Sequence, residues 1–347
     1  MIIILTLTMG LLFFQFYISP IYEKDLPWYL KQIEIEKAWG ISNGGNSNIT
    51  IAIIDSGIDF NHPSLAHSQW INKNEIPNND VDDDNNGFID DIHGWDFFSS
   101  DNTPGPEIND PIDSHGTSIA GIIAGKSTSK KIMGISPNVK LMDLRILNKS
   151  GSFVSNYTVF ADAVYYAINN SADIINLSLQ YFSNSSILSE CFKEAVNSNI
   201  PVVSITGNYF KDSEPYGLEY DSFPGAFPEV IAVSATNFYF EKADYANFGS
   251  TVELVAPVGD ANDTNMHQLL STSLNDGYSY SIGTSFASPQ VCAVIALMKS
   301  IKNDLSVEEI RLILRQTAID LGTSGWDNYF GYGLLNSSAA VFATSLI

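Results

Sequence analysis

Short runs of apolar, often β-branched residues recur along the chain and are separated by longer segments with helical spacing of apolar positions. Runs such as "IAII" and "IINL" do not alternate with polar residues, which is typical of strands covered on both faces of a sheet. The pattern predicts strands at residues 50–54, 139–144, 173–177, 201–205, 230–234 and 252–255. It predicts helices at residues 115–125, 155–169, 186–198, 284–302 and 306–318.

The order of these elements predicts the fold class. Strands that alternate with helices are typical of a parallel sheet. We therefore expect an α/β fold, with a doubly wound, mostly parallel sheet and helices on both faces. One hairpin is predicted around Asn275-Asp276-Gly277, because Asp-Gly supplies the positive φ values of a tight turn. No internal repeat and no Gly/Ser/Pro-rich linker divides the chain, so residues 21–347 are expected to form one domain.

The N-terminal stretch has a different composition from the rest. Residues 1–18 are apolar except for Thr6, Thr8, Gly10 and Gln15. That length suits a signal peptide or a membrane anchor, so residues 1–20 are expected to be one of these. The Lys or Arg that usually precedes such a run is missing, and a core strand is the alternative, although no alternation favours it. We expect a secreted or extracytoplasmic protein, with possible membrane attachment through residues 1–18.

Composition and charge restrict the partners. The chain has 347 residues, 45% of them hydrophobic, which is enough for a full core. Lys and Arg total 17 against 39 Asp and Glu, a formal charge of -22 that repels phosphate backbones. Nucleic acid is therefore not expected as a partner, and a monomer is expected. Cys191 and Cys292 lie in apolar helical stretches and are expected to be small buried thiols, so no disulfide framework is implied.

Three polar residues stand at the ends of apolar elements. In "IAIIDSGID" a buried strand ends in Asp55, and open α/β sheets bind ligands at the carboxyl ends of their strands. In "DSHGTSIAGIIAG", His115 begins a helix rich in small residues, which let it approach the sheet closely. In "SIGTSFASPQ", Ser285 begins a long apolar helix. Taken singly, the three have structural explanations as a turn residue, a helix start and a helix cap.

Together, the three residues indicate nucleophilic catalysis. A serine hydroxyl is a weak nucleophile unless an imidazole accepts its proton, and a carboxylate must orient that imidazole and stabilise its charge. We therefore predict that Ser285 is the nucleophile, His115 the general base and acid, and Asp55 the residue that orients His115.

The same stretches resemble a known family. "DSGIDFNHP", "HGTSIAGIIAG" and "GTSFASPQ" look like the three signature blocks of the subtilisin-like serine proteases, and they occur in the family's order of Asp, His and Ser. The resemblance runs from about Trp28 to "GYGLLNSSAA" near the C-terminus, which is similar to the family's closing helix. It implies a subtilisin-like fold and a peptide or protein substrate.

The resemblance also implies an oxyanion site and a substrate-binding edge. The tetrahedral intermediate of acyl transfer carries a negative oxygen that needs preorganised donors. "VVSITGNYF" matches the family's Gly-Asn, so Asn208 is expected to donate through its side-chain amide, together with the Ser285 backbone N–H. Ser178, Leu179, Gln180 and Gly207 are expected to bind substrate, in part by adding the peptide as a strand. The family usually has Gly in place of Gln180 and His in place of Gln290.

An acidic loop at residues 78–91, "NNDVDDDNNGFIDD", predicts a cation site. Counting from Asp82, oxygen ligands fall at Asp82, Asp84, Asn86 and the Phe88 carbonyl, with Gly87 at the sharp turn, as at the start of an EF-hand loop. The twelfth position is His93 rather than Glu, so Asp90 or Asp91 would have to complete the site. Such loops also occur in many subtilases. We expect a structural Ca²⁺; a solvated loop without metal is the alternative.

Taken together, the sequence predicts a subtilisin-like serine endopeptidase that works through an acyl-enzyme intermediate. Two other functions are consistent with the same residues. One is an inactive, calcium-stabilised subtilase fold that serves as a binding module. The other is a peptide ligase or cyclase, in which an amine replaces water in attack on the acyl-enzyme.

Overall fold

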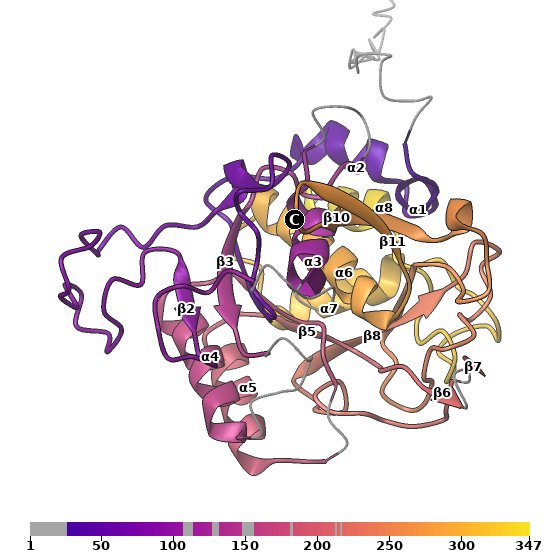
Figure 1. Ribbon diagram of the computed structural model, residues 1–347. Helices are drawn as coiled ribbons and strands as arrows, with labels where there is room; N and C mark the ends of the chain where they lie inside the picture. Colours follow the sequence, from indigo (N-terminus) through magenta and orange to yellow (C-terminus); the bar gives the residue numbers. More distant parts are fainter. Residues whose placement is uncertain are drawn as a thin grey trace, which may run out of the picture.

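A seven-stranded sheet forms the centre of the computed structural model, which describes residues 26–106, 114–126, 132–147, 156–180, 183–211, 214–215 and 217–347. The strand order is β2-β3-β1-β4-β5-β8-β9, and each neighbouring pair is parallel (Figure 1). The strands are β1 (Thr50–Asp55), β2 (Gly94–Asp96), β3 (Lys140–Arg145), β4 (Ile174–Leu177), β5 (Val202–Ile205), β8 (Val230–Thr236) and β9 (Leu254–Pro257).

The sheet is buried on both faces, as apolar runs such as that of β1 predict. Because side chains alternate along a strand, Ile51 and Ile53 of β1 belong to one core, whereas Ala52 and Ile54 belong to the other. All four are fully buried. The two cores together explain why "IAII" carries no polar position.

Helices cover each face, and Figure 1 shows α4 and α5 on the opposite side of the sheet from α3 and α6. Side chains of α4 (Tyr157–Asn169) and α5 (Ser186–Asn197) form one core with the sheet. The other core contains side chains from α1 (Trp28–Gln32), α2 (Ile35–Ser42), α3 (Ser114–Ala124), α6 (Ser288–Ile301), α7 (Val307–Thr317) and α8 (Ser337–Thr344). The predicted doubly wound, mostly parallel α/β sheet with helices on both faces is therefore confirmed.

Within the described residues, only Thr284–Ile301 has the length and hydropathy of a candidate membrane span. However, 83% of this stretch is buried inside the protein, and α6 packs against β4 and β5. Its apolar composition is therefore that of a core helix. Residues 1–25, which include the predicted signal peptide or anchor at residues 1–20, lie outside the described residues.

Each predicted strand and helix is present, with ends that differ by a few residues. The sequence pattern did not reveal the short elements α1, α2 and β2, which have too few residues for a clear period. The small strands β6 (Phe210–Lys211) and β7 (Glu214–Pro215) pair antiparallel. The predicted hairpin is formed by β10 (Leu269–Ser273) and β11 (Gly277–Ser281). Its positive φ values belong to Asn275 and Asp276, at 58° and 56°, rather than to Asp-Gly.

The start of the central helix differs from the prediction in a way that affects Ser285. The expected helix at residues 284–302 is divided into a 3₁₀ turn at Thr284–Phe286 and α6, which begins at Ser288. Pro289 explains the division, because proline has no N–H to donate to the carbonyl four residues earlier, and its ring would collide with that carbonyl. The carbonyl concerned is that of Ser285. It accepts a hydrogen bond from Ser178 Oγ at 2.9 Å instead.

The topology brings the predicted site residues to one edge of the sheet. β1 has β3 on one side and β4 on the other, so the chain winds in opposite directions from it, and ligands bind at the carboxyl ends of strands at such a point. Asp55 is the last residue of β1. Ser178 directly follows β4, and Gly207-Asn208 follow β5 within a few residues.

Candidate active site

Asp55 is completely buried and has well-defined hydrogen bonds. Its Oδ1 accepts from the Ser56 backbone N–H at 2.7 Å. Both carboxylate oxygens lie within hydrogen-bonding distance of His115 Nδ1, at 2.8 Å for Oδ1 and 3.0 Å for Oδ2. Two residues that are 60 positions apart in the sequence are thus joined directly.

Close packing of α3 makes this contact possible. His115 is the second residue of α3, and Gly116 follows it. A β-carbon on Gly116 would lie 2.5 Å from the carbonyl oxygen of Gly57, in the loop after β1. Only a glycine allows the helix to approach that loop so closely. The Gly116 N–H also donates to Ser56 Oγ at 3.0 Å, which fixes the start of α3 beside Asp55.

The environment of His115 sets its protonation. Burial disfavours the charged imidazole, but the Asp55 charge and the hydrogen bond to it outweigh burial, so the pKa of His115 is raised above 6.5. With a hydrogen on Nδ1 donated to Asp55, the neutral ring leaves Nε2 as the acceptor. The side chain is 25% exposed, so the ring remains accessible at the surface.

Ser285 lies in the 3₁₀ turn beside His115. The rings of His115 and of Phe286, the residue after Ser285, pack edge to face with centroids 5.7 Å apart. The Ser285 hydroxyl donates to the Ser178 carbonyl oxygen at 3.2 Å. It is not hydrogen-bonded to His115, and catalytic hydrogen bonds are often long or misaligned before substrate binds. Ser285 is 9% exposed, so only its outer side reaches solvent.

Asn208 has all but one of its polar groups engaged. Its backbone N–H donates to Gln180 Oε1 at 2.9 Å, and its carbonyl accepts from Gln180 Nε2 at 3.3 Å. Its Oδ1 accepts from the N–H and the hydroxyl of Thr284, at 2.8 and 2.9 Å. Asn208 Nδ2 therefore remains as a donor, in an amide that is fixed next to Ser285.

The expected substrate-binding residues lie around this amide. Ser178 is 3% exposed and Leu179 4% exposed, so their side chains face the interior. Gln180 spans from the end of the β4 segment to Asn208. A β-carbon on Gly207, which has a φ of 94°, would lie 2.1 Å from Gln180 Oε1. Gln180, where the resembled family usually has Gly, thus fills the space beside Gly207.

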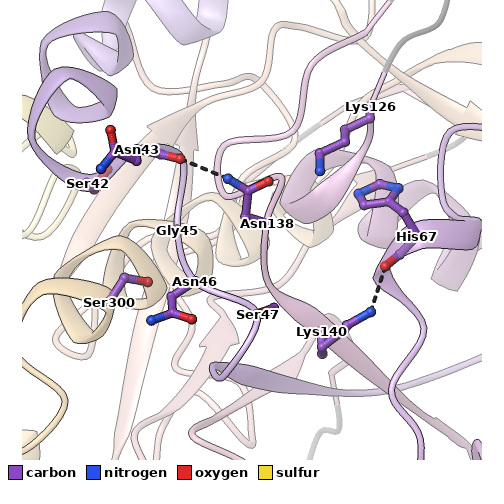
Figure 2. Close-up of a pocket in the computed structure, with 10 residues that line it drawn as sticks. All are labelled: Ser42, Asn43, Gly45, Asn46, Ser47, His67, Lys126, Asn138, Lys140 and Ser300. Atoms are coloured by element: carbon purple, nitrogen blue, oxygen red, sulfur yellow. Dashed lines mark hydrogen bonds between the residues drawn. The ribbon is translucent and has the colours of Figure 1, made fainter.

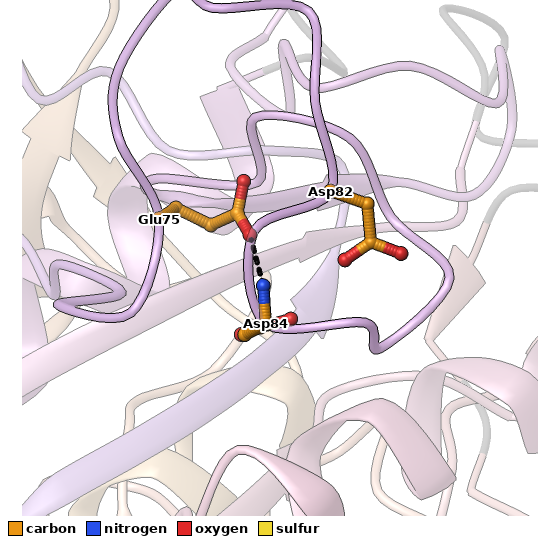
Figure 3. Close-up of side chains that lie close together, drawn as sticks. All are labelled: Glu75, Asp82 and Asp84. Carbon is orange, nitrogen blue, oxygen red and sulfur yellow. Dashed lines mark hydrogen bonds between the residues drawn. The ribbon is translucent and has the colours of Figure 1, made fainter.

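The acidic loop contains a compact group of carboxylates. Oxygen atoms of Glu75, Asp82 and Asp84 lie within 4.8 Å of one another (Figure 3). Glu75 is 6% exposed and accepts from the backbone N–H groups of Asp83, Asp84 and Asp90, at 2.8, 3.1 and 3.0 Å. The sequence interpretation missed Glu75 because it precedes the Asp-rich run.

The other residues predicted at the metal site have different contacts. Asn86 Oδ1 accepts from the Phe88 N–H at 2.8 Å. The Phe88 ring packs against Trp95, Phe97 and Tyr166. The Asp90 carboxylate accepts from the backbone N–H groups of Asn79 and Asp80. The Asp91 carboxylate accepts from Asn72, Asn86 and Tyr166. Neither Asp90 nor Asp91 belongs to the three-carboxylate group with Glu75.

The chemistry of this group fits a hard cation. Calcium prefers several carboxylate, amide and carbonyl oxygens, and Glu75, Asp82 and Asp84 supply carboxylates in a loop that also contains Asn86. Among the described residues, no lysine or arginine forms an ion pair with these three carboxylates. Burial raises the pKa of Glu75, as expected for a carboxylate without a cation beside it.

Comparison with known proteins finds one matching family and several similar proteins. A sequence model described as "Subtilase family" matches residues 46–333. The thermophilic serine proteinase of Bacillus sp. (strain AK1) is 33% identical over 88% of this chain and 64% of its own length. Halolysin of Haloferax mediterranei is 34% identical over 90% of this chain and 52% of its own length.

Other relatives differ in length and in named location. The intracellular serine protease of Paenibacillus polymyxa is 31% identical over 91% of this chain and 86% of its own length. Two further relatives are named as extracellular proteases. The chain thus spans less than two thirds of the length of the first two relatives, but most of the third.

Proposed function

Because the chain belongs to the subtilase family, we propose that it is a serine endopeptidase that hydrolyses peptide bonds through an acyl-enzyme intermediate. The observation that carries the proposal is the buried Asp55 carboxylate bonded to His115, with the turn of Ser285 packed against the imidazole. A buried carboxylate that orients a partly exposed imidazole supports proton transfer at the surface.

In the proposed first step, Ser285 Oγ forms a bond to the carbonyl carbon of the scissile peptide, while His115 Nε2 takes the hydroxyl proton. His115 must rotate slightly or Ser285 must change rotamer, so that the hydroxyl leaves the Ser178 carbonyl and points to the imidazole. The C–N bond then breaks as His115 returns the proton to the leaving amine. Water, deprotonated by His115, then attacks the ester carbon; the bond from that carbon to Ser285 Oγ breaks as His115 returns the proton to Oγ.

Asn208 is proposed to stabilise the oxyanion of each tetrahedral intermediate. The proposal is supported by the saturation of its other polar groups, which leaves Nδ2 fixed in direction before the reaction begins. A donor that needs no reorganisation stabilises the transition state most effectively. The Ser285 backbone N–H is proposed as the second donor, and Ser178, Leu179, Gln180 and Gly207 as the residues that contact the substrate.

We also propose that the acidic loop holds a structural calcium ion. Glu75, Asp82 and Asp84 would bind it, with Asn86 and the Phe88 carbonyl close by in the loop. The ion would offset two of the three negative charges of carboxylates that otherwise repel one another, and so stabilise the loop after β1. It has no assigned step in the reaction.

The family match covers residues 46–333. The role of residues 1–20 is therefore a separate proposal. We propose that they direct the catalytic domain at residues 21–347 out of the cytoplasm, as a signal peptide or an anchor. Relatives named as extracellular proteases support this location, whereas one relative is named as intracellular.

Incubation of the purified chain with a mixed peptide library, analysed by mass spectrometry, tests the proposed activity. We expect hydrolysis products with the chain and none with Ser285→Ala. Ligated or cyclic peptides, formed from the acyl-enzyme without addition of water, would indicate a ligase or cyclase instead. A library left intact but bound by the chain would contradict the peptidase and favour a binding module.

A further inference from the structure

A polar pocket of about 510 Å³ lies far from the candidate active site. Its lining includes Lys140, the first residue of β3, which is in register with Thr50 at the start of β1. Asp55 is at the other end of β1, in register with Arg145. At ~3.3 Å per residue, the pocket and the Asp55–His115 pair are separated by roughly the length of the sheet's strands.

Three basic side chains line one part of this pocket, and Figure 2 shows them grouped together. His67 comes from the short 3₁₀ helix Ala66–Ser68, Lys126 from the chain just after α3, and Lys140 from β3. Among the described residues that line the pocket there is no Asp or Glu.

The positive charges in this pocket are not neutralised by the described residues. Neither Lys126 nor Lys140 forms an ion pair there. Lys140 Nζ donates to the His67 carbonyl at 2.7 Å, and His67 Nε2 is 2.9 Å from the Pro137 carbonyl. Each contact uses one hydrogen, of the Lys140 ammonium group or of the His67 ring, and fixes that side chain in place. The Lys126 side chain makes no hydrogen bond with a described residue.

The electrostatic effect of this grouping is visible at His67 and Lys126. Burial and the charge of Lys140 lower the pKa of Lys126. Burial and the charges of Lys126 and Lys140 also lower the pKa of His67, although its bond to the Pro137 carbonyl opposes them. An anion bound in the pocket would raise the pKa of both groups.

Neutral hydrogen-bond donors complete the lining on the other side. Asn46 Oδ1 accepts from the Asn48 N–H at 3.0 Å, so its Nδ2 remains to donate. Asn138 Nδ2 instead donates to the Asn43 carbonyl at 2.8 Å, and Figure 2 shows its amide oxygen on the side of Lys126. The Ser47 hydroxyl lies in the same lining. Ammonium groups and amide donors around one cavity are the chemistry that binds anionic oxygens.

We propose that this pocket is a binding site for a phosphate group, either as inorganic phosphate or as a phosphate monoester. Two lysine charges with a neutral His67 are matched by a dianion, whereas a single carboxylate would leave one ammonium group uncompensated. The several oxygens of a phosphate can also accept from more than one donor of the lining at the same time. The site is independent of the peptidase chemistry proposed for Ser285.

Titration of the full chain with inorganic phosphate at constant ionic strength tests the proposal, with the His67 imidazole followed by NMR. We expect a saturable shift of the His67 signal and a higher pKa of His67 in the bound state. Linkage then requires the affinity for the phosphate dianion, after correction for the protonation of phosphate itself, to increase as the pH falls through the His67 titration. Acetate should bind more weakly than inorganic phosphate. Titration with glycerol phosphate tests whether the pocket also accepts a phosphate monoester.

Matched variants separate a specific site from general charge. Lys126 is exposed and makes no side-chain hydrogen bond with the part of the chain that the structure describes. Lys126→Gln should weaken phosphate binding by about tenfold or more, as the loss of a charge-assisted contact predicts. Lys37→Gln, at a side chain that is 71% exposed on α2, removes the same charge elsewhere and should leave affinity unchanged. A non-saturating shift, or equal affinity in the chain and in Lys126→Gln, would overturn the proposal.

Discussion

The pair formed by Asp55 and His115 shows how one buried carboxylate can set both the position and the protonation of an imidazole. Asp55 has no access to solvent, so its charge acts on His115 with little screening. It raises the pKa of His115 against the opposing effect of burial. It also selects the tautomer with hydrogen on Nδ1, which a general base at Nε2 requires.

The variant Asp55→Asn tests this role. We expect kcat to fall by about 10⁴, the scale of loss when the orienting carboxylate of such a triad is replaced. His115 must be neutral to act as a base, so kcat/KM should increase as the pH rises through the His115 pKa. Removal of the Asp55 charge lowers that pKa, so the acid limb of the residual activity should move to lower pH. An unmoved limb would contradict the assignment.

At this scale the sequence predicted residue types and their order, but not all contacts. The block order indicated that Asp55 and His115 would meet, and the structure joins them by hydrogen bonds. The engagement of the Ser285 hydroxyl by the Ser178 carbonyl could not be predicted, because it depends on a rotamer. Glu75 was missed because the interpretation began at the Asp-rich run.

At the scale of elements, the site depends on how segments after neighbouring strands are tied together. Ser178 follows β4 and bonds to the Ser285 carbonyl that Pro289 leaves without a helical partner. Gln180 continues the same segment and bonds to the backbone of Asn208 after β5. The expectation that Ser285 begins the α-helix itself was wrong, since residues 284–286 form a 3₁₀ turn before α6.

We predict that Gln180 restricts the substrate side chain accepted beside Gly207. Gln180→Gly would empty the space that the Gln180 amide now fills. The kcat/KM for peptides with a large aromatic residue before the scissile bond should therefore rise relative to the kcat/KM for peptides with alanine at that position. Specificity profiling of both proteins with a peptide series measures this ratio. Gln180→Glu keeps the volume and serves as the control; an unchanged ratio in Gln180→Gly would reject the prediction.

For the acidic loop we predict that calcium stabilises the folded chain. A ligand that binds only the folded state raises the free energy of unfolding, by about 2.7 kcal/mol at 100 times its Kd. The melting temperature therefore rises with the ligand concentration. The melting temperature should therefore fall on chelation and recover with calcium. Asp84→Asn should reduce this response, whereas Asp304→Asn, at a side chain that is 85% exposed, should retain it. Identical transitions with and without chelator would exclude the ion.

At the scale of the whole molecule, the long apolar strands and helices were predictable because they must satisfy burial over many residues. Both faces of the sheet are covered, so the strands are largely apolar, with buried polar residues such as Asp143 of β3 as exceptions. Short elements such as α1, α2 and β2 carry too little periodic signal, and their form depends on contacts with distant segments. The basic pocket could not be inferred either, because His67, Lys126 and Lys140 meet only in the folded chain.

The buried carboxyl of Asp143, in β3, gives the fold a specific pH dependence. Burial raises the pKa of Asp143 well above 3.8, while its Oδ2 accepts from the Ile58 N–H at 2.8 Å and Oδ1 has no partner among the described residues. In the unfolded chain this carboxyl ionises at about pH 4, whereas in the folded chain it stays protonated to higher pH. The free energy of unfolding therefore falls as the pH rises from about 4 toward the folded-state pKa.

Asp143→Asn removes this ionisation and keeps the acceptor for Ile58. We expect a higher melting temperature than the parent chain at pH 7, with the two curves converging near pH 4. Asp143→Ala instead leaves the Ile58 N–H buried without an acceptor and should cost about 1–3 kcal/mol of unfolding free energy. A gain for Asp143→Asn that is the same at both pH values would show that Asp143 is not the titrating group.

The identity of the nucleophile is tested most directly by reaction with a fluorophosphonate probe, followed by mass spectrometric mapping of the modified residue. The account predicts one adduct, on Ser285, which is abolished in Ser285→Ala and strongly reduced in His115→Ala while both variants keep the parent's circular dichroism spectrum. An adduct on another serine, or labelling that persists in Ser285→Ala, would contradict it.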